Sequence, residues 1–472
     1  MMGCSTWRWW RIVREATRAV ACTLACGLVV PTQAADDPID FSAFLVLREI
    51  DLPKREPLTA ATAWGEDAEQ TLVKVLKRLD APEGLAAGWP AEATPAPAAG
   101  EAVAVADTLL AVRGKATFVA PRRLPPGLAE LFGKAEYDIV RIVDDRGLVV
   151  DVVTNAAPRE WPRWQPIDEP AGAIGLALAT AAAPRPQAAP AGSSEWPAAA
   201  PALVLGAARV AWYPDTPLGR IGMDYGLFDT VVDGTKLGAG DAAAFYAVLG
   251  AAGRTGREAI AEAAGGLTDV LPLIDPARGW FPARRGDPVV IDGVAMRAMK
   301  VSIDEPYLRK AVDADHYWEV FVFVETPLLD VNGRKQTSFP IVCCMRELPP
   351  GMPSGERINE RVRVAGFGFK RYAYTFEELR PDATGRVPEE LGRRQTTLLI
   401  GPQPAWSPPP TEAATQSIWV IAAIAAAVVL AAMLGLGLIY GNWSLNRSIR
   451  RSREELPDRI DLPAADDQES GR

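Results

Sequence analysis

Histidine and cysteine are scarce in this chain, and their scarcity excludes several kinds of active site. Among 472 residues there are one histidine, His316, and five cysteines. A Ser-His-Asp or Cys-His site would have to use His316, and no serine or cysteine stands in a nucleophile-elbow context that could pair with it. The spaced glycines before Lys and Ser/Thr that cradle phosphates are also absent. We therefore expect no catalytic residue, no cofactor and no enzymatic activity.

The few metal-ligating residues are poorly arranged for a metal ion. Asp313, Asp315 and His316 lie together, but no second histidine and no cysteine is near them in the sequence. We interpret them as a solvated loop and predict no metal site. Cys343 and Cys344 are adjacent on an expected strand, where neighbouring side chains point to opposite faces. One should be buried and the other half exposed.

Positive charge is also in deficit. The formal net charge is −9 at pH 7, and an acidic surface repels polyanions. The composition therefore argues against nucleic acid as a partner.

Two hydrophobic runs indicate the membrane. Residues 1–34 have a basic start, a short apolar run and small residues before Asp36, which are the three parts of a signal peptide. An uncleaved anchor and a lipoprotein at Cys26 are the alternatives. Ile418–Tyr440 carries no charge, is long enough to span a bilayer, and is flanked by Trp419. The arginines that follow predict a cytoplasmic tail over 441–472, with the preceding chain in the periplasm or outside the cell.

Proline and alanine are concentrated in stretches that divide the part between these runs. We expect a first helix-plus-β unit over 41–180, with linker-like residues 81–105 inside it, and a second unit over 203–400. The segment 181–202 is predicted as an Ala/Pro linker, and 401–417 as a stalk before the membrane.

The two units resemble each other in their order of elements. Helical spacing of apolar residues predicts helices over 66–79 and 237–251, the second capped by Asp241. Strand patterns follow each helix, over 111–180 and 288–376. A similar phrase occurs near the end of each block, at 167–176 and 358–367. We interpret this as a degenerate internal duplication.

The glycines in these strands favour a small curved sheet. The predicted fold class is α+β, mostly β: two tandem units of a helix and a small OB-like barrel, followed by one transmembrane helix. A two-sheet sandwich is the second possibility.

One segment mixes basic and aromatic side chains in the way that binding surfaces do. On a strand, alternate residues share a face, so basic and aromatic residues of equal parity would lie together. The alternative is a core strand with a basic rim. The candidate binding residues are Arg361, Arg363, Phe367, Phe369, Lys370, Arg371, Tyr372 and Tyr374.

These observations favour a membrane-anchored, extracytoplasmic interaction or adaptor protein of the bacterial envelope. Its partner would be another envelope protein or a glycan. Two alternatives remain open: a carboxylate-dependent hydrolase of cell-wall glycans, and a structural subunit of an envelope assembly whose transmembrane helix makes contacts through small residues.

Overall fold

The computed structural model describes most of the chain between Asp40 and Tyr440. The described residues are 40–59, 64–80, 89–101, 105–180, 186, 189–331, 334–375, 393–408 and 422–440. They fall into two compact units, 1–405 and 406–472. Helix and strand occur in about equal amounts, so the chain is mixed α/β and the expectation of a mostly β protein was wrong. The predicted signal peptide and cytoplasmic tail lie outside the described residues.

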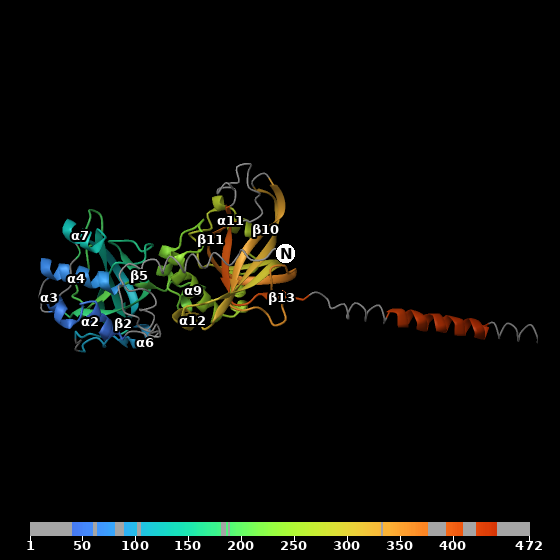
Figure 1. Ribbon diagram of the computed structural model, residues 1–472, viewed down its shortest axis with the longest axis horizontal. Coiled ribbons are helices and arrows are strands. Elements are labelled where there is room, and N and C mark those ends of the chain that lie inside the picture. The colour runs from blue at the N-terminus through green and yellow to red at the C-terminus, as the bar shows by residue number, and fades with distance from the viewer. Residues whose placement is uncertain are drawn as a thin grey trace, which may run out of the picture. The chain divides into compact units, whose positions relative to one another are not determined.

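The first half of the chain builds a seven-stranded sheet with helices around it (Figure 1). Its elements, in chain order, are α2 (Phe41–Leu47), η1 (Leu52–Arg55), α3 (Glu56–Thr59), α4 (Glu66–Leu79), α6 (Trp89–Glu92), β1 (Thr94–Pro95), β2 (Leu109–Arg123), α7 (Pro126–Phe132), β3 (Glu136–Asp144), β4 (Val149–Thr154), β5 (Pro166–Ala179), β6 (Leu203–Ala207) and β7 (Ala211–Trp212). The strand order is β1-β2-β3-β4-β6-β5-β7, and β2 also pairs with β5. Strands β2 to β6 thus form a closed hydrogen-bonded ring, which we call the first ring.

The second half builds a six-stranded sheet in the same way. Its elements are α8 (Pro217–Arg220), η2 (Tyr225–Thr230), α9 (Ala239–Gly253), α10 (Arg257–Ala264), α11 (Val270–Ile274), η3 (Pro276–Arg278), β8 (Pro288–Ser302), α12 (Pro306–Val312), β9 (His316–Val331), β10 (Arg334–Met345), β11 (Glu360–Thr375), β12 (Arg393–Gly401) and β13 (Ala405–Ser407). The order is β12-β10-β9-β8-β11-β13, and β12 also pairs with β11. Strands β8 to β12 form the second ring.

The two rings have the same topology. In each, the first strand pairs with the second and the fourth, the second with the third, and the fifth with the third and the fourth. The pairing of third with fifth strand is the parallel one in both, β4 with β6 and β10 with β12. The first strand is 15 residues long in both, and a helix of seven residues with proline at its start, α7 or α12, leads to the second strand.

Two glycines of the similar sequence phrases occupy the same place in the two rings. Gly175 on β5 pairs with the second residue of β2, and Gly366 on β11 pairs with the second residue of β8. A Cβ at Gly175 would lie 2.5 Å from the carbonyl oxygen of Gly206, and one at Gly366 would lie 2.7 Å from that of Ile400. Both glycines therefore allow the fourth strand to approach the fifth more closely than any side chain permits.

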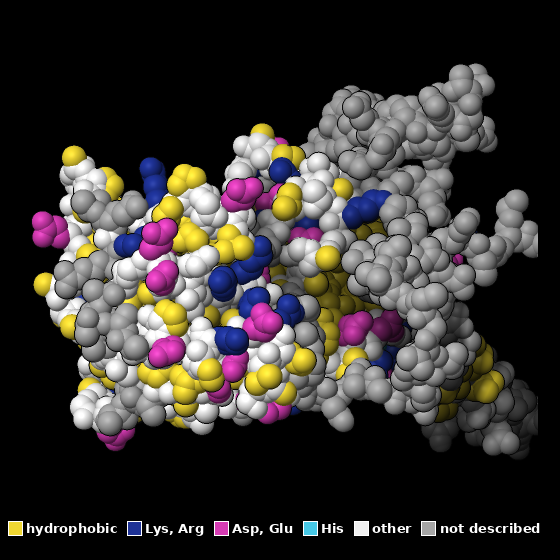
Figure 2. Space-filling view, turned by 60° about the vertical axis from the view of Figure 1, so that its left-hand side comes forward, with side chains coloured by type: hydrophobic (Ala, Val, Ile, Leu, Met, Phe, Trp, Pro, Cys, Tyr) yellow, Lys and Arg dark blue, Asp and Glu magenta, His cyan; other side chains and the backbone are white. Residues whose placement is uncertain are grey.

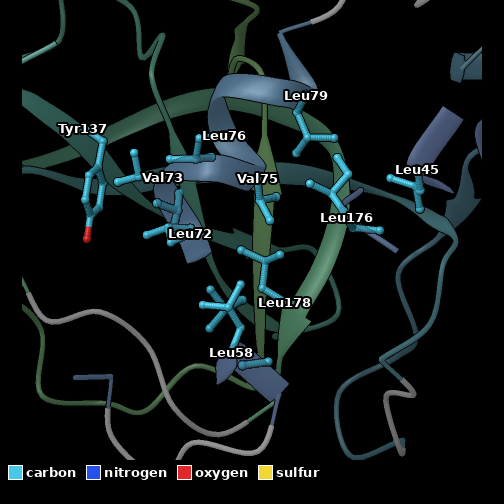
Figure 3. Close-up of a cluster of buried hydrophobic side chains, with 14 of the residues drawn as sticks. Leu45, Leu58, Leu72, Val73, Val75, Leu76, Leu79, Tyr137, Leu176 and Leu178 are labelled. Atoms are coloured by element: carbon cyan, nitrogen blue, oxygen red, sulfur yellow. The ribbon is translucent and has the colours of Figure 1, made fainter. Parts of the chain in front are cut away.

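Each ring carries one long amphipathic helix. The predicted helix 66–79 is α4, and its residues Leu72, Leu76 and Leu79 are buried against Leu176 and Leu178 of β5 (Figure 3). Each fully buried leucine contributes about 1.5–3 kcal/mol. The predicted helix 237–251 is α9, which begins two residues later, at Ala239.

Several strands are buried on both faces. In the first ring, Leu176 and Leu178 belong to the cluster under α4, whereas Ala173 and Ala177 of the same strand belong to a second apolar cluster. The same holds for β10, where Cys343 and Cys344 are both buried and free. The expectation that one of the two cysteines is half exposed was therefore wrong, because both faces of their strand are covered.

The structure also moves the predicted unit boundaries. Leu203–Ala207 is β6, which pairs with β4 and β5 and closes the first ring. The predicted linker 181–202 thus falls between two strands of the first ring, and its half-buried Trp196 packs against the core of that ring. The second ring begins later than residue 203. The linker-like stretch 81–105 contains α6 and β1, and the predicted stalk contains β13.

The two rings do not have the shape of a barrel, so the predicted OB-like barrel is not shown. In the compact unit 406–472, Ala422–Tyr440 is a helix long and apolar enough to cross a membrane. It covers most of the predicted span, whose residues 418–421 lie outside the described part.

Replacing either closing glycine should destabilise the protein. We expect Gly175→Ala and Gly366→Ala each to lower the free energy of unfolding by about 1–3 kcal/mol, because the added methyl group overlaps a backbone oxygen. Gly127→Ala is the matched control, since no heavy atom lies within 4 Å of its Cβ position. Urea unfolding of the detergent-solubilised protein, followed by tryptophan fluorescence, measures the effect. Equal stability of the three variants would contradict the proposed role of the two glycines.

Candidate functional site

One face of the second ring is covered by helices over part of its area and open over the rest. Ala365 and Phe367 of β11 lie in the apolar cluster that α9 covers. Farther toward the start of the same strand, Arg361 is exposed. Arg361 pairs with Val294 of β8, and Val294 pairs with Phe323 of β9, so these residues form one row across three strands.

A hollow of about 610 Å³ lies at the end of this row. Phe323 is 37% exposed and Met296 is 41% exposed, so part of each apolar side chain faces solvent in the hollow. The described lining residues are Val294, Met296, Phe323, Glu325, Thr326, Thr337, Ser338 and Asn359. Apolar side chains ringed by amide, hydroxyl and one carboxylate are typical of a recognition surface.

Of the eight predicted binding residues, Arg361 and Arg363 are exposed. Arg363 donates two hydrogen bonds to Asp292, at 2.6 Å and 2.7 Å, and the bonds hold the pKa of that carboxyl below its usual range. Arg361 has no hydrogen bond or ion pair with any described residue, so its charge is available to a ligand.

Phe367 and Phe369 share a strand face with Arg361 and Arg363, as their parity predicted, but they are fully buried. The ring of Phe369 lies 5.8 Å from that of Phe245 in α9. The two phenylalanines are therefore core residues, and the predicted residues do not form one surface.

Lys370 is also buried, with 0% of its side chain exposed, because it binds α9. Its Nζ donates to both carboxylate oxygens of Asp241, at 3.0 Å and 2.9 Å, and to the hydroxyl of Thr235 at 3.0 Å. Asp241 also accepts the backbone N–H of Gly238. Asp241 is thus the third residue of α9, with Gly238 as the N-cap, and the prediction of Asp241 as the cap was wrong.

The last three predicted residues lie near the end of β11. Arg371 is half-buried, and its backbone N–H donates to Asp233. Tyr372 is also half-buried, and burial raises the pKa of its hydroxyl. Tyr374 belongs to β11, but its side chain lies outside the described part.

The other candidate groups are not assembled into a reactive site. The imidazole of His316 pairs with the neighbouring carboxylate of Asp315 and lies edge-on to the ring of Trp318. No cluster of three metal-ligating side chains occurs among the described residues. Burial raises the pKa of the Cys343 and Cys344 thiols, which disfavours the reactive thiolate.

A second hollow, of about 570 Å³, lies where α9 and α12 end and α10 begins. Arg346 lines it, but its guanidinium donates to the carbonyl oxygens of Val312 and Asp313 at the end of α12. Arg257 likewise pairs with Glu258. Because the charges there bind each other and the helix ends, this hollow is the weaker candidate.

Sequence reasoning missed Phe323, Met296 and Glu325. The alternation of aromatic and aliphatic residues over 317–325 predicted the strand, but both faces of most strands are buried, so alternation could not identify the open part. No protein-family model and no curated protein matches the chain.

The buried pair of Lys370 and Asp241 should be required for stability. We expect Lys370→Met to lower the free energy of unfolding by about 3–5 kcal/mol, because it leaves a buried carboxylate without its positively charged partner. The double variant Lys370→Met/Asp241→Leu should recover much of the loss. Arg363→Met, which breaks an exposed pair on the same strand, is the control and should have little effect. Thermal unfolding of the solubilised protein tests this, and equal effects of Lys370→Met and Arg363→Met would contradict it.

Proposed function

We propose that the chain is a membrane-anchored interaction protein of the bacterial envelope, and that the hollow beside Phe323 and Met296 is its partner-binding surface. The observation that carries the proposal is a hollow in which Phe323 and Met296 are partly exposed and polar side chains lie beside them. Patches of this kind mark interaction sites on soluble domains.

The membrane part of the proposal rests on the C-terminal helix. Ala422–Tyr440 is apolar throughout, with Trp443 and then Arg447, Arg450 and Arg451 after it in the sequence. Aromatic residues favour the interface, and basic residues favour the cytoplasmic side. Together with the N-terminal signal, this supports an anchored protein whose two rings lie outside the cytoplasm.

A non-enzymatic role fits the chemistry of the hollow. A glycosidase of the usual kind needs two carboxyl groups about 5–10 Å apart in a cleft. Glu325 is the single carboxylate among the described residues that line the hollow. The hydrolase alternative would therefore need a second acid from elsewhere.

We also propose that each ring is a flattened relative of the OB-type unit. Five strands closed through a parallel pair of the third and fifth strands support the relationship. The proposal concerns topology alone and carries no ligand with it.

Site-specific crosslinking in living cells tests the proposed function. A photoreactive amino acid in place of Met296 should capture one defined envelope protein. The same group in place of Val232, which is 58% exposed but outside the hollow, should not capture it. The same products from both positions, or no product from either, would count against the proposal.

A change in the membrane helix distinguishes the proposed function from the structural-subunit alternative. We expect Gly435→Leu/Gly437→Leu to leave the Met296 crosslink intact, since no heavy atom lies within 4 Å of either Cβ position in the helix. Loss of the crosslink would favour the alternative, in which the helix itself makes the contacts through its small residues.

A further inference from the structure

Strand β9 continues beyond the point where its neighbour β8 leaves it. It pairs with β8 from His316 to Phe323, and with β10 from Trp318 to Val331. From Val324 onward, no described strand pairs with β9 on its β8 side. A strand edge presents backbone donors and acceptors in a row, and another extended backbone is the group that pairs with such a row.

The continuation of β9 is an addition to the second ring. In the first ring, the ladder of β3 and β4 ends at the pair Val143 and Val149, next to the turn. Phe323 occupies the place of Val143, because the Cβ positions of Gly114 and Gly293 meet the carbonyl oxygens of Val143 and Phe323, respectively. The second ring therefore has the same scaffold as the first, with a longer β9–β10 hairpin attached.

The chain fills comparable edges with its own extended segments. β1 lies along β2, and the N–H of Ala96 donates to the carbonyl of Ala111 at 2.9 Å. At the corresponding place in the second ring, the N–H of Thr268 donates to the carbonyl of Val290 at 2.8 Å. Both additions are short. The β9 edge beyond Phe323 has no such segment among the described residues.

The hollow lies directly beside this edge and offers more than the backbone. Phe323 and Met296 provide an apolar floor, and Glu325 provides the one charge among the described lining residues.

We propose that the partner binds as an extended peptide strand, added to the edge of β9 at Val324–Thr326, directly after the pair of Phe323 with Val294 of β8. One apolar side chain of this peptide enters the hollow over Phe323 and Met296, and a basic side chain two positions away faces Glu325. The pairing is short, like that of β1 with β2, because Pro327 has no N–H to continue it. This inference rests on the proposed function and adds the chemistry of the partner.

Selection of peptides on the full-length, detergent-solubilised protein tests the proposal. The probe is a displayed library of extended peptides of about eight residues with alternating apolar positions. Selected peptides should contain an apolar residue and, two positions away from it, Lys or Arg. Their affinity should fall about tenfold or more with Phe323→Ala or Met296→Ala, and stay unchanged with Val232→Ala. The backbone amides of the peptide form two alternating sets, and only one set points to β9. N-methylation of that set should abolish binding, since it removes the donors to β9.

Three results of the peptide experiment would overturn the proposal. They are the absence of any selected peptide, equal affinity for wild type and Phe323→Ala, and tolerance of N-methylation in both registers, which would mean binding through side chains alone. A dimer in sedimentation that Phe323→Ala dissociates would assign the edge to a second copy of this chain and likewise overturn it. If the Met296 crosslink still captures an envelope protein in these cases, the proposed function stands and only the strand-addition mode fails.

Discussion

Both rings close where the fourth strand meets the fifth at a distance that leaves no room for a side chain. Gly175 and Gly366 meet this constraint at equivalent positions, and the other features of each ring follow from the closure. A closed ring buries alternate side chains in a shared interior, and its outer face must then be covered by helices. The helices α4 and α9 provide this cover. Each helix is tied to its ring by an acid in its first turn, Glu69 with Arg122 and Asp241 with Lys370.

Some features occur in both rings, and others occur in the second ring. Features that both rings share, such as the closing glycine, the covering helix and the short helix between the first two strands, are required by the fold itself. The long β9–β10 hairpin and the open hollow at its base occur in the second ring, and the fold does not require them. The second ring leaves Phe323 and Met296 partly exposed. A partner that covers these two apolar side chains would gain binding free energy from their burial.

Local patterns in the sequence predicted local structure well and predicted burial poorly. The helical stripe of 66–79 and the first four strands of the second ring, β8 to β11, were expected, whereas β12 was not. The similar phrases around Gly175 and Gly366 occupy equivalent strands. The short strand β6 was missed because it follows a Pro/Ala-rich stretch and depends on pairing with distant strands. The parity of Phe367 was read correctly, but its burial depends on α9. Lys370 is buried by Asp241, a residue 129 positions away, which no local pattern could reveal.

Hydrogen–deuterium exchange compares the chain in its native membranes with the purified protein and tests the central claim most directly. The claim is that the edge of β9 is occupied in the cell by an extended strand of a partner. Peptides covering Phe323–Thr326 should exchange more slowly in native membranes than after purification, whereas peptides around Val232 should exchange equally in both. Equal exchange over Phe323–Thr326 in the two states would contradict the account.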